Sequence, residues 1–314
     1  MASLDAACAA APRLAGHGRC EYSGIADRPA YSWNNGARLA VYVAVNLEHF
    51  TYGSGLGARL VPADAPSGCL NYSWREYGNR VGAFRLLDTL AALRLPVAVL
   101  ANSAMFAHCP GLMRAYMQHA PGAELVGHGR TNAERQDTMS EEEERQLIAE
   151  STAVLAAAQD RPPAGWLSPW IAESDVTSCL LAESGYGYTL NWAHDDAPVR
   201  LRTRSGRPFL SVPYPQDGTN DIPAIVARQE TPQQFADAII DAFDELYAQA
   251  VAGGPALVMG IALHPYLVGQ PHRLGHLRRA LQHVAAPRPG VWLCTPGQVA
   301  EEARTLLPVP PTVL

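Results

Sequence analysis

The sequence predicts an α/β protein organised as a (β/α) barrel. Short apolar runs rich in β-branched and aromatic residues alternate with amphipathic stretches, a pattern typical of parallel strands separated by helices. About seven such units fit the 314-residue chain, which favours a closed barrel over an open sheet. A G-x-G-x-x-G fingerprint opening a helix, which would indicate a dinucleotide-binding sheet, is absent.

Seven runs have the pattern of buried strands. The first, residues 38–46, follows the turn-like sequence Asn34-Asn35-Gly36. The other six runs are residues 96–101, 125–127, 188–190, 209–213, 257–263 and 291–294. Their alternation with helical stretches gives the order expected of a barrel.

Helix signals separate these runs. Residues 79–93 carry apolar side chains at helical spacing. Ser140 begins a capping box with four glutamates, which predicts a helix reaching about residue 158. Thr231 and Thr295 are each followed by a proline and, three residues on, by a glutamine, and we expect each to start a helix. We expect Ser174 to cap a further short helix.

Composition excludes several classes of function. All 24 basic residues are arginine, so a lysine Schiff base and a P-loop lysine are both ruled out. The net charge is −6, with no basic block and no apolar run long enough to cross a bilayer. We therefore expect neither nucleic acid nor membrane as a partner.

The chain divides into an arm and one domain. Residues 1–30 begin with an alanine-rich stretch that lacks the basic start of a signal peptide, which predicts a disordered or extended arm. Residues 31–314 hold no linker, so we expect a single catalytic barrel domain. The six scattered cysteines indicate reduced thiols, and with the arm they predict a cytoplasmic location.

Three candidate catalytic residues follow predicted strands. Glu48 comes after the first run, His128 lies between two glycines after residues 125–127, and His264 comes directly after residues 257–263. Functional side chains of a barrel gather at the carboxyl ends of its strands. A carboxylate and two imidazoles can activate water, stabilise an oxyanion and protonate a leaving nitrogen, although each residue alone fits a solvated loop or a satisfied core histidine.

Several segments give the chain a family resemblance. They are Asn46-Leu47-Glu48, residues 75–82 (REYGNRVG), Gly127-His128-Gly129, Gly165-Trp166, Ser168-Pro169, Asp195-Asp196-x-Pro198, residues 212–215 (VPYP), Asn220-Asp221 and Leu263-His264-Pro265. Through them the chain resembles the NodB-homology polysaccharide deacetylase superfamily, in particular its branch of metal-independent allantoinases and cyclic imide hydrolases. The resemblance covers residues 31–303 and implies a distorted (β/α)7-type barrel.

Departures from the sugar deacetylases are informative. Those enzymes place two adjacent aspartates after the first strand, whereas this chain has Glu48-His49. They also bind a metal with two histidines four residues apart, whereas Asn132 stands in the second place after His128. Neutral asparagine is a poor zinc ligand, so no metal is expected. If a divalent metal such as zinc binds, Glu48, His49 and His128 are the expected ligands.

The resemblance implies a hydrolase of carbon–nitrogen bonds other than peptide bonds. The first hypothesis is ring-opening of a small cyclic imide or ureide, with Glu48, His128 and His264 as the catalytic residues. The expected substrate-binding residues are His49, Trp166, Trp170, Asp195, Asp196, Tyr214 and Asn220. The alternatives are a metal-dependent deacetylase of an N-acetylated sugar or acylated amine, in carbohydrate metabolism, and a non-catalytic barrel. The family also implies a homo-oligomer, either a dimer or a tetramer.

Overall fold

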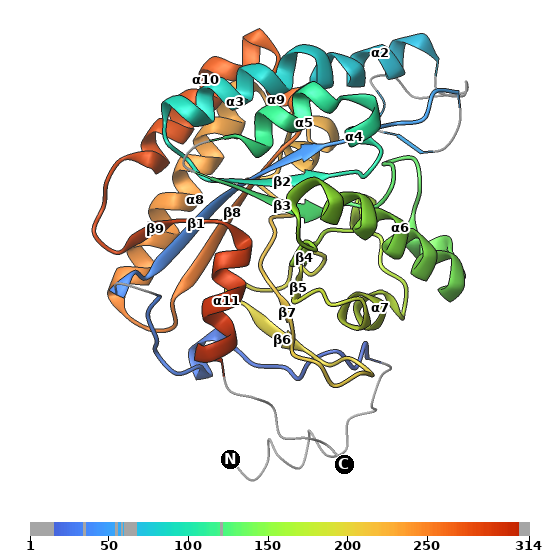
Figure 1. The fold of residues 1–314 in the computed structure, drawn as a ribbon. Helices are drawn as coiled ribbons and strands as arrows, with labels where there is room; N and C mark the ends of the chain where they lie inside the picture. Colours follow the sequence, from blue (N-terminus) through green and yellow to red (C-terminus); the bar gives the residue numbers. More distant parts are fainter. Residues whose placement is uncertain are drawn as a thin grey trace.

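The chain forms one sheet of nine strands within the part that the computed structural model describes, namely residues 16–33, 36–53, 56–57, 59, 68–119 and 122–307. The strand order is β6-β7-β5-β4-β3-β2-β1-β8, and β9 pairs with β1 (Figure 1). The strands are β1 (Leu39–Leu47), β2 (Val97–Ala101), β3 (Ala123–Gly127), β4 (Gly165–Trp166), β5 (Tyr188–Thr189), β6 (Val199–Leu201), β7 (Phe209–Ser211), β8 (Leu257–Leu263) and β9 (Val291–Leu293). Strands β6 and β7 pair antiparallel, and the other pairs are parallel.

The segment after β7 bridges the gap between the two ends of the sheet. The Tyr42 hydroxyl on β1 donates a hydrogen bond to the Pro213 carbonyl. The Thr219 hydroxyl donates to the Gly260 carbonyl at 2.8 Å, and the Ala262 amide donates to the Thr219 carbonyl at 2.9 Å. These bonds join β8 to the chain beyond β7, so the sheet curves into a distorted barrel, as the sequence predicts.

Helices surround this sheet (Figure 1). They are α2 (Cys69–Tyr77), α3 (Ala83–Ala92), α4 (Met105–His108), α5 (Pro110–Met117), α6 (Glu141–Gln159), α7 (Thr177–Glu183), α8 (Pro232–Ala252), α9 (Pro265–Val268), α10 (Pro271–Ala285) and α11 (Pro296–Leu306). Shorter turns are η1 (Ile25–Asp27), η3 (Gly78–Gly82), η4 (Gln136–Thr138), η5 (Pro169–Ile171) and η6 (Ile222–Ala227). The capping box expected at Ser140 is present, and the helices expected to start at Thr231 and Thr295 do begin directly after these residues.

The structure corrects several sequence predictions. The helix expected over residues 79–93 begins earlier, as α2, and the π-helical turn η3 divides α2 from α3. Ser174 is not an N-cap: α7 begins at Thr177 after Val176, while the Ser174 hydroxyl accepts from the Val176 amide at 3.1 Å. Strands β4 and β6 were not predicted, because neither lies in a continuous apolar run: β4 is flanked by prolines at 162, 163 and 169, and β6 contains Arg200 and is followed by Arg202.

Two hydrophobic cores follow from the alternation of side chains along the strands. On β1, Val41 and Val43 pack outward against the helices, whereas Tyr42 and Ala44 face the inside of the barrel. Helix α11 packs Val299, Ala300 and Ala303 on this inner core. The Gly297 amide donates to the Glu124 carboxylate at 2.8 Å, at the start of β3. Helix α11 thus covers the amino end of β3 and leaves the carboxyl ends of the strands for a site.

Two glycines of η3 are needed for a close approach to α9. A Cβ on Gly78 would lie 2.6 Å from the Tyr266 amide nitrogen, and a Cβ on Gly82 would lie 2.2 Å from the Pro265 carbonyl oxygen. Both residues have ordinary negative φ, so space rather than backbone conformation requires glycine. This explains the two glycines of the stretch at residues 75–82: they let η3 pack directly on the residues that follow His264.

Candidate active site

Glu48, His128 and His264 converge at the carboxyl ends of three strands. They follow β1, β3 and β8, and all three are buried. Glu48 Oε1 lies 3.5 Å from His128 Nε2 and 3.5 Å from His264 Nε2, so one carboxylate oxygen stands between two imidazoles. The expectation that these three side chains share a site is met geometrically, while their catalytic role stays a prediction.

Asp221 holds His264 from the other side. Its Oδ1 accepts from His264 Nδ1 at 2.6 Å, and its Oδ2 accepts from the His264 amide at 2.7 Å. Asp221 is fully buried and directly precedes η6. Because a carboxylate can only accept, Nδ1 carries the proton and Nε2 faces Glu48. The orientation of the His264 ring is therefore fixed, with Nδ1 bonded to Asp221 and Nε2 directed at Glu48.

The electrostatic interactions among Glu48, His264 and Asp221 favour the charged forms of Glu48 and His264. Burial opposes ionisation of Glu48, but the positive charge of His264 outweighs it, with a further contribution from His128 when that ring is protonated, and the pKa of this carboxyl is lowered to about 2. Burial likewise opposes the charged form of His264, yet Asp221 and Glu48 on its two sides raise the pKa of this imidazole to about 10. At neutral pH the pair is thus a carboxylate facing an imidazolium.

His128 presents a lone pair to the same space. Its Nδ1 lies 2.7 Å from the Leu167 carbonyl oxygen, which can only accept, so Nδ1 is the donor. In the neutral ring Nε2 is then an acceptor. Nε2 is buried and has no hydrogen-bond partner among the described residues, which is the state expected of a group that meets a ligand or water.

A cavity of about 210 Å³ opens in front of these groups. Its apolar walls include Leu167, Ile171, Ile222 and Val226, and its polar wall includes Asn46, Ser168 and Asn132. Three buried atoms of lining residues have no partner within the described chain: Glu48 Oε2, His128 Nε2 and Asn132 Oδ1. All three are acceptors, so the cavity is built to receive a molecule that donates hydrogen bonds.

Three of the seven predicted substrate-binding residues line this cavity. They are Trp170, Tyr214 and Asn220. Trp170 donates from its indole to the Asn132 carbonyl at 2.9 Å, and the Tyr214 hydroxyl accepts from Asn46 Nδ2 at 3.1 Å. The Asn220 amide is used within its own loop, since it donates to the Pro215 carbonyl and accepts from the Ile222 amide. Trp170 and Tyr214 are therefore the residues available to contact a ring.

The other predicted substrate-binding residues lie elsewhere. Trp166 is fully buried in a separate core, where its indole donates to Gln136 and Ser168. His49 does not line the cavity. Because successive side chains of an extended backbone alternate in direction, the residue after Glu48 faces away from the space that Glu48 faces. Neither residue is assigned to the substrate site.

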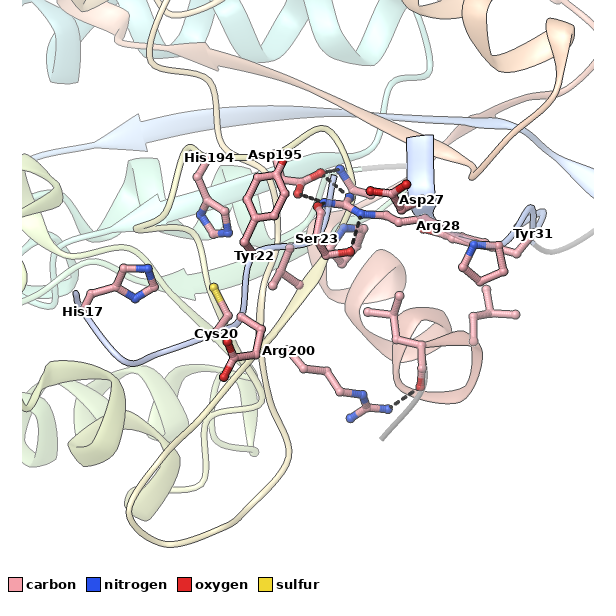
Figure 2. Close-up of a pocket in the computed structure, with 17 residues that line it drawn as sticks. His17, Cys20, Tyr22, Ser23, Asp27, Arg28, Tyr31, His194, Asp195 and Arg200 are labelled. Carbon is pink, nitrogen blue, oxygen red and sulfur yellow. Dashed lines mark hydrogen bonds and ion pairs between the residues drawn. The ribbon is translucent and has the colours of Figure 1, made fainter. Parts of the chain in front are cut away.

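Asp195 and Asp196 lie far from His264. The Asp196 carbonyl accepts from the Val258 amide at 2.8 Å, near the start of β8. Val258 precedes His264 by six residues, which is roughly 20 Å along a strand. Figure 2 shows Asp195 in a different pocket, where Arg28 of the N-terminal segment pairs with it at 2.5 Å. Asp195 therefore anchors this segment, and neither aspartate lines the catalytic cavity.

Sequence reasoning missed Asp221 and Asn132 as site residues. Asp221 stands in the Asn-Asp pair of the family-like segments, and a buried acid after a glycine- and asparagine-rich turn was the available signal. Asn132 was interpreted only as a lost metal ligand. Its side-chain oxygen is buried, unpartnered and part of the cavity wall, so it is a candidate substrate contact.

Of the three expected metal ligands, Glu48 and His128 lie together in the cavity, but His49 belongs to a different cluster. Among the described residues, one group of three or more His, Cys, Asp or Glu side chains offers donor atoms within 4.8 Å of one another, and it consists of His49, Glu76 and His108. Glu48 and His128 are not part of it. In the cavity, donor atoms of Glu48, His128 and His264 do not all lie within 4.8 Å of one another, and Asp221 and Glu48 keep His264 protonated, so that its ring cannot be a metal ligand. The metal site of the sugar deacetylases therefore does not fit the cavity residues.

Comparisons with known proteins agree with this architecture. A Schizosaccharomyces pombe protein described as a candidate polysaccharide deacetylase is 25% identical over 248 residues, which are 72% of this chain and 73% of that protein. The solved structure of PuuE allantoinase is similar with a TM-score of 0.79 and 26% identity, over 90% of this chain and 95% of that one. The structure of a candidate polysaccharide deacetylase from Pseudomonas aeruginosa gives a TM-score of 0.78 and 26% identity, over 90% and 96%.

No protein-family model matches the chain. In the part that the structure describes, no helix is both long and apolar enough to cross a bilayer. The curated relative and the two structures nevertheless agree with one another and with the barrel. In sequence and in fold the chain is similar to hydrolases of the NodB-homology polysaccharide deacetylase superfamily, including its allantoinase-like branch.

Proposed function

We propose that this protein hydrolyses a carbon–nitrogen bond of a small cyclic imide or ureide without a catalytic metal. The observation that carries the proposal is the set of three buried, unpartnered acceptors around the cavity, Glu48 Oε2, His128 Nε2 and Asn132 Oδ1. Leaving a buried acceptor unpaired costs about 1–3 kcal/mol, so three in one cavity indicate that the bound state supplies donors. A nucleophilic water and a ring N–H supply them.

Water activation follows from two of these acceptors. A water molecule between Glu48 Oε2 and His128 Nε2 donates one proton to each, which orients its lone pair towards a ring carbonyl. With a pKa of about 2 the Glu48 carboxylate is a weak base, so it orients the water and balances charge. His128 accepts the proton as the water oxygen bonds to the carbonyl carbon.

His264 stabilises the charge that then develops. As the carbonyl becomes tetrahedral its oxygen takes up the electron pair, and the His264 imidazolium faces that oxyanion. The carbon–nitrogen bond breaks as the electron pair returns, and the proton held by His128 passes to the leaving nitrogen. The products are a carboxylic acid and an amide or urea on one opened chain, so all atoms of ring and water are retained.

The size of the cavity supports a small substrate. Pockets for drug-sized ligands occupy roughly 300–1,000 Å³, and this cavity of about 210 Å³ is smaller. Asn132 Oδ1 is placed to accept the ring N–H, and Trp170 and Tyr214 offer flat surfaces for the ring. The name of the allantoinase relative, an enzyme of a cyclic ureide, agrees with this substrate class.

The test is a hydrolysis panel on chelator-treated protein. Succinimide, hydantoin, dihydrouracil and allantoin are compared with an N-acetylglucosamine oligomer, each with and without added zinc. We expect at least one ring to open at the same rate in both conditions. Release of acetate from the oligomer, only with zinc and with no ring opened, would favour the deacetylase alternative. No turnover of any compound would favour the non-catalytic barrel.

A further inference from the structure

A second cluster of titratable side chains lies outside the cavity. His49 follows β1, Glu76 lies on α2, and His108 ends α4. One donor atom from each lies within 4.8 Å of the other two. The two imidazole rings are 4.2 Å apart between centroids, and His108 Nε2 lies 3.2 Å from Glu76 Oε2. None of the three lines the catalytic cavity, and the proposed hydrolysis uses none of them.

The geometry points to a divalent transition-metal site formed by His49, Glu76 and His108, and zinc is the metal that we propose. Two imidazole nitrogens and one carboxylate oxygen are a ligand set that zinc accepts, whereas magnesium and calcium prefer sets made of oxygen alone. The site is independent of the proposed hydrolase activity, because it shares no side chain with the cavity.

The His49 side chain is positioned to bind a metal ion. Its Nδ1 is buried and has no hydrogen-bond partner in the described chain. The backbone on both sides of the ring is fixed, since the His49 amide donates to Asn102 Oδ1 at 2.8 Å and the His49 carbonyl accepts from the Asn132 amide at 2.8 Å. A buried nitrogen without a partner among the described residues, together with a carboxylate and a second imidazole that offer donor atoms within 4.8 Å, fits a bound cation.

Glu76 has the supporting contact that ligating carboxylates show. Its Oε1 accepts from Asn79 Nδ2 at 3.1 Å, which leaves Oε2 turned to His108. The same Asn79 Nδ2 donates to the Glu48 carbonyl at 3.0 Å. A metal at the cluster would therefore tie α2 and α4 to the loop that carries Glu48, and it would stiffen the cavity without entering it.

The cluster is reachable from solvent. The His108 side chain is 34% exposed, so a fourth ligand position is open to water. The Arg80 guanidinium, which is 78% exposed, lies 3.7 Å from Glu76 Oε2 and competes with a cation for that oxygen. Since such an exposed side chain can move away, Arg80 weakens metal binding without preventing it. Arg80→Ala is expected to tighten binding about threefold to tenfold.

The test is metal titration of the chelator-stripped full chain. Zinc is titrated in competition with a chromophoric chelator, and cobalt is titrated separately while its visible absorption is recorded. We expect one tight equivalent per chain. We expect His49→Ala, Glu76→Gln and His108→Ala each to abolish it, and Asn79→Ala to weaken it about 10–100-fold.

Matched controls locate the metal. His272→Ala removes an exposed histidine on α10 and should bind zinc as the parent does. Glu48→Gln and His128→Ala should also retain it. Circular dichroism verifies folding, and partly exposed His108 is the variant least expected to unfold. Failure of the parent to bind one equivalent, or loss of binding in Glu48→Gln and His128→Ala but not in His108→Ala, would overturn the proposal. Because binding is the readout, the result is separate from that of the hydrolysis panel.

Discussion

Two hollows of this molecule differ in how their polar groups are paired. The pocket between the N-terminal segment and the loop after β5 has a volume of about 500 Å³, and its charged groups meet one another, as Arg28 and Asp195 do (Figure 2). The catalytic cavity has about 210 Å³, yet it holds three buried acceptors without partners among the described residues. The larger pocket also has buried atoms without partners among the described residues, Tyr31 Oη and Arg200 Nε, but neither a phenol nor a guanidinium serves as a base at neutral pH. The comparison teaches that the chemistry of the unpaired atoms, more than volume, indicates where a reaction takes place.

The largest effects are expected from the catalytic cluster. Glu48→Gln and His264→Ala should each lower kcat by about 10²–10⁴-fold, because one removes the charge that orients water and the other removes the oxyanion partner. Steady-state kinetics on the best ring substrate measure this. The exposed substitutions Glu142→Gln and His272→Ala are the matched controls. Full activity in both cluster variants would end the assignment and would leave the cavity without a function.

Asp221→Asn should have a smaller effect on rate and a distinct effect on pH dependence. The parent needs His264 as imidazolium, so its rate should fall as pH rises through about 10. Asp221 and Glu48 raise the pKa of His264, and loss of the Asp221 charge lowers it. The decrease of kcat on the alkaline side of the pH profile (the basic limb) should therefore occur at lower pH in the variant. Asp241→Asn, on the exposed face of α8, should leave the limb unchanged, and an unmoved limb in Asp221→Asn would remove Asp221 from its positioning role.

Asn132→Ala should act mainly on substrate binding. Loss of one hydrogen bond from the ring N–H is worth about 1.4 kcal/mol, which is about tenfold in kcat/KM. An N-methylated ring lacks that N–H, so it should not distinguish the variant from the parent. A variant that discriminates against the N-methyl compound as strongly as the parent does would mean that another group contacts the N–H.

The smallest effect is expected at the other hollow. Arg28→Ala removes a partly buried pair with Asp195 and should lower the free energy of unfolding by about 1 kcal/mol, as measured by urea denaturation. Because Arg28 does not line the catalytic cavity, kcat/KM of the variant should stay within about twofold of the parent value, a difference below about 0.5 kcal/mol. A large loss of activity would mean that the N-terminal segment takes part in the reaction, and the contrast between the two hollows would disappear.

The sequence predicted the parts of the site that depend on strand ends. Glu48, His128 and His264 each follow an apolar run, and the carboxyl ends of parallel strands lie at one end of a barrel, so their convergence could be expected. Asp195 and Asp196 could not be placed in this way. The chain turns back after β5 into the antiparallel β6, whose three residues carry no readable pattern.

The direction of single side chains was also beyond the sequence. His49 is adjacent to Glu48, but one residue along an extended backbone reverses the direction of a side chain, and His49 therefore meets Glu76 and His108. Glu76 and His108 come from α2 and α4, and the approach of these helices to the residue after β1 is a tertiary property. Asp221 was missed for a related reason, since its contact with His264 joins residues 43 positions apart.

The position of His264 depends on the absence of a Cβ atom at Gly78 and Gly82 in η3. Any side chain at Gly78 or Gly82 would meet the backbone of Tyr266 or Pro265 and push it outward. The ring of His264 would follow, because its own peptide continues directly into that helix. A methyl group added at either glycine, neither of which lines the cavity, would thus misalign proton transfer while leaving each catalytic residue in the sequence. Substitutions that inactivate this protein therefore need not replace a residue of the active site. A search limited to the residues that line the cavity would overlook them.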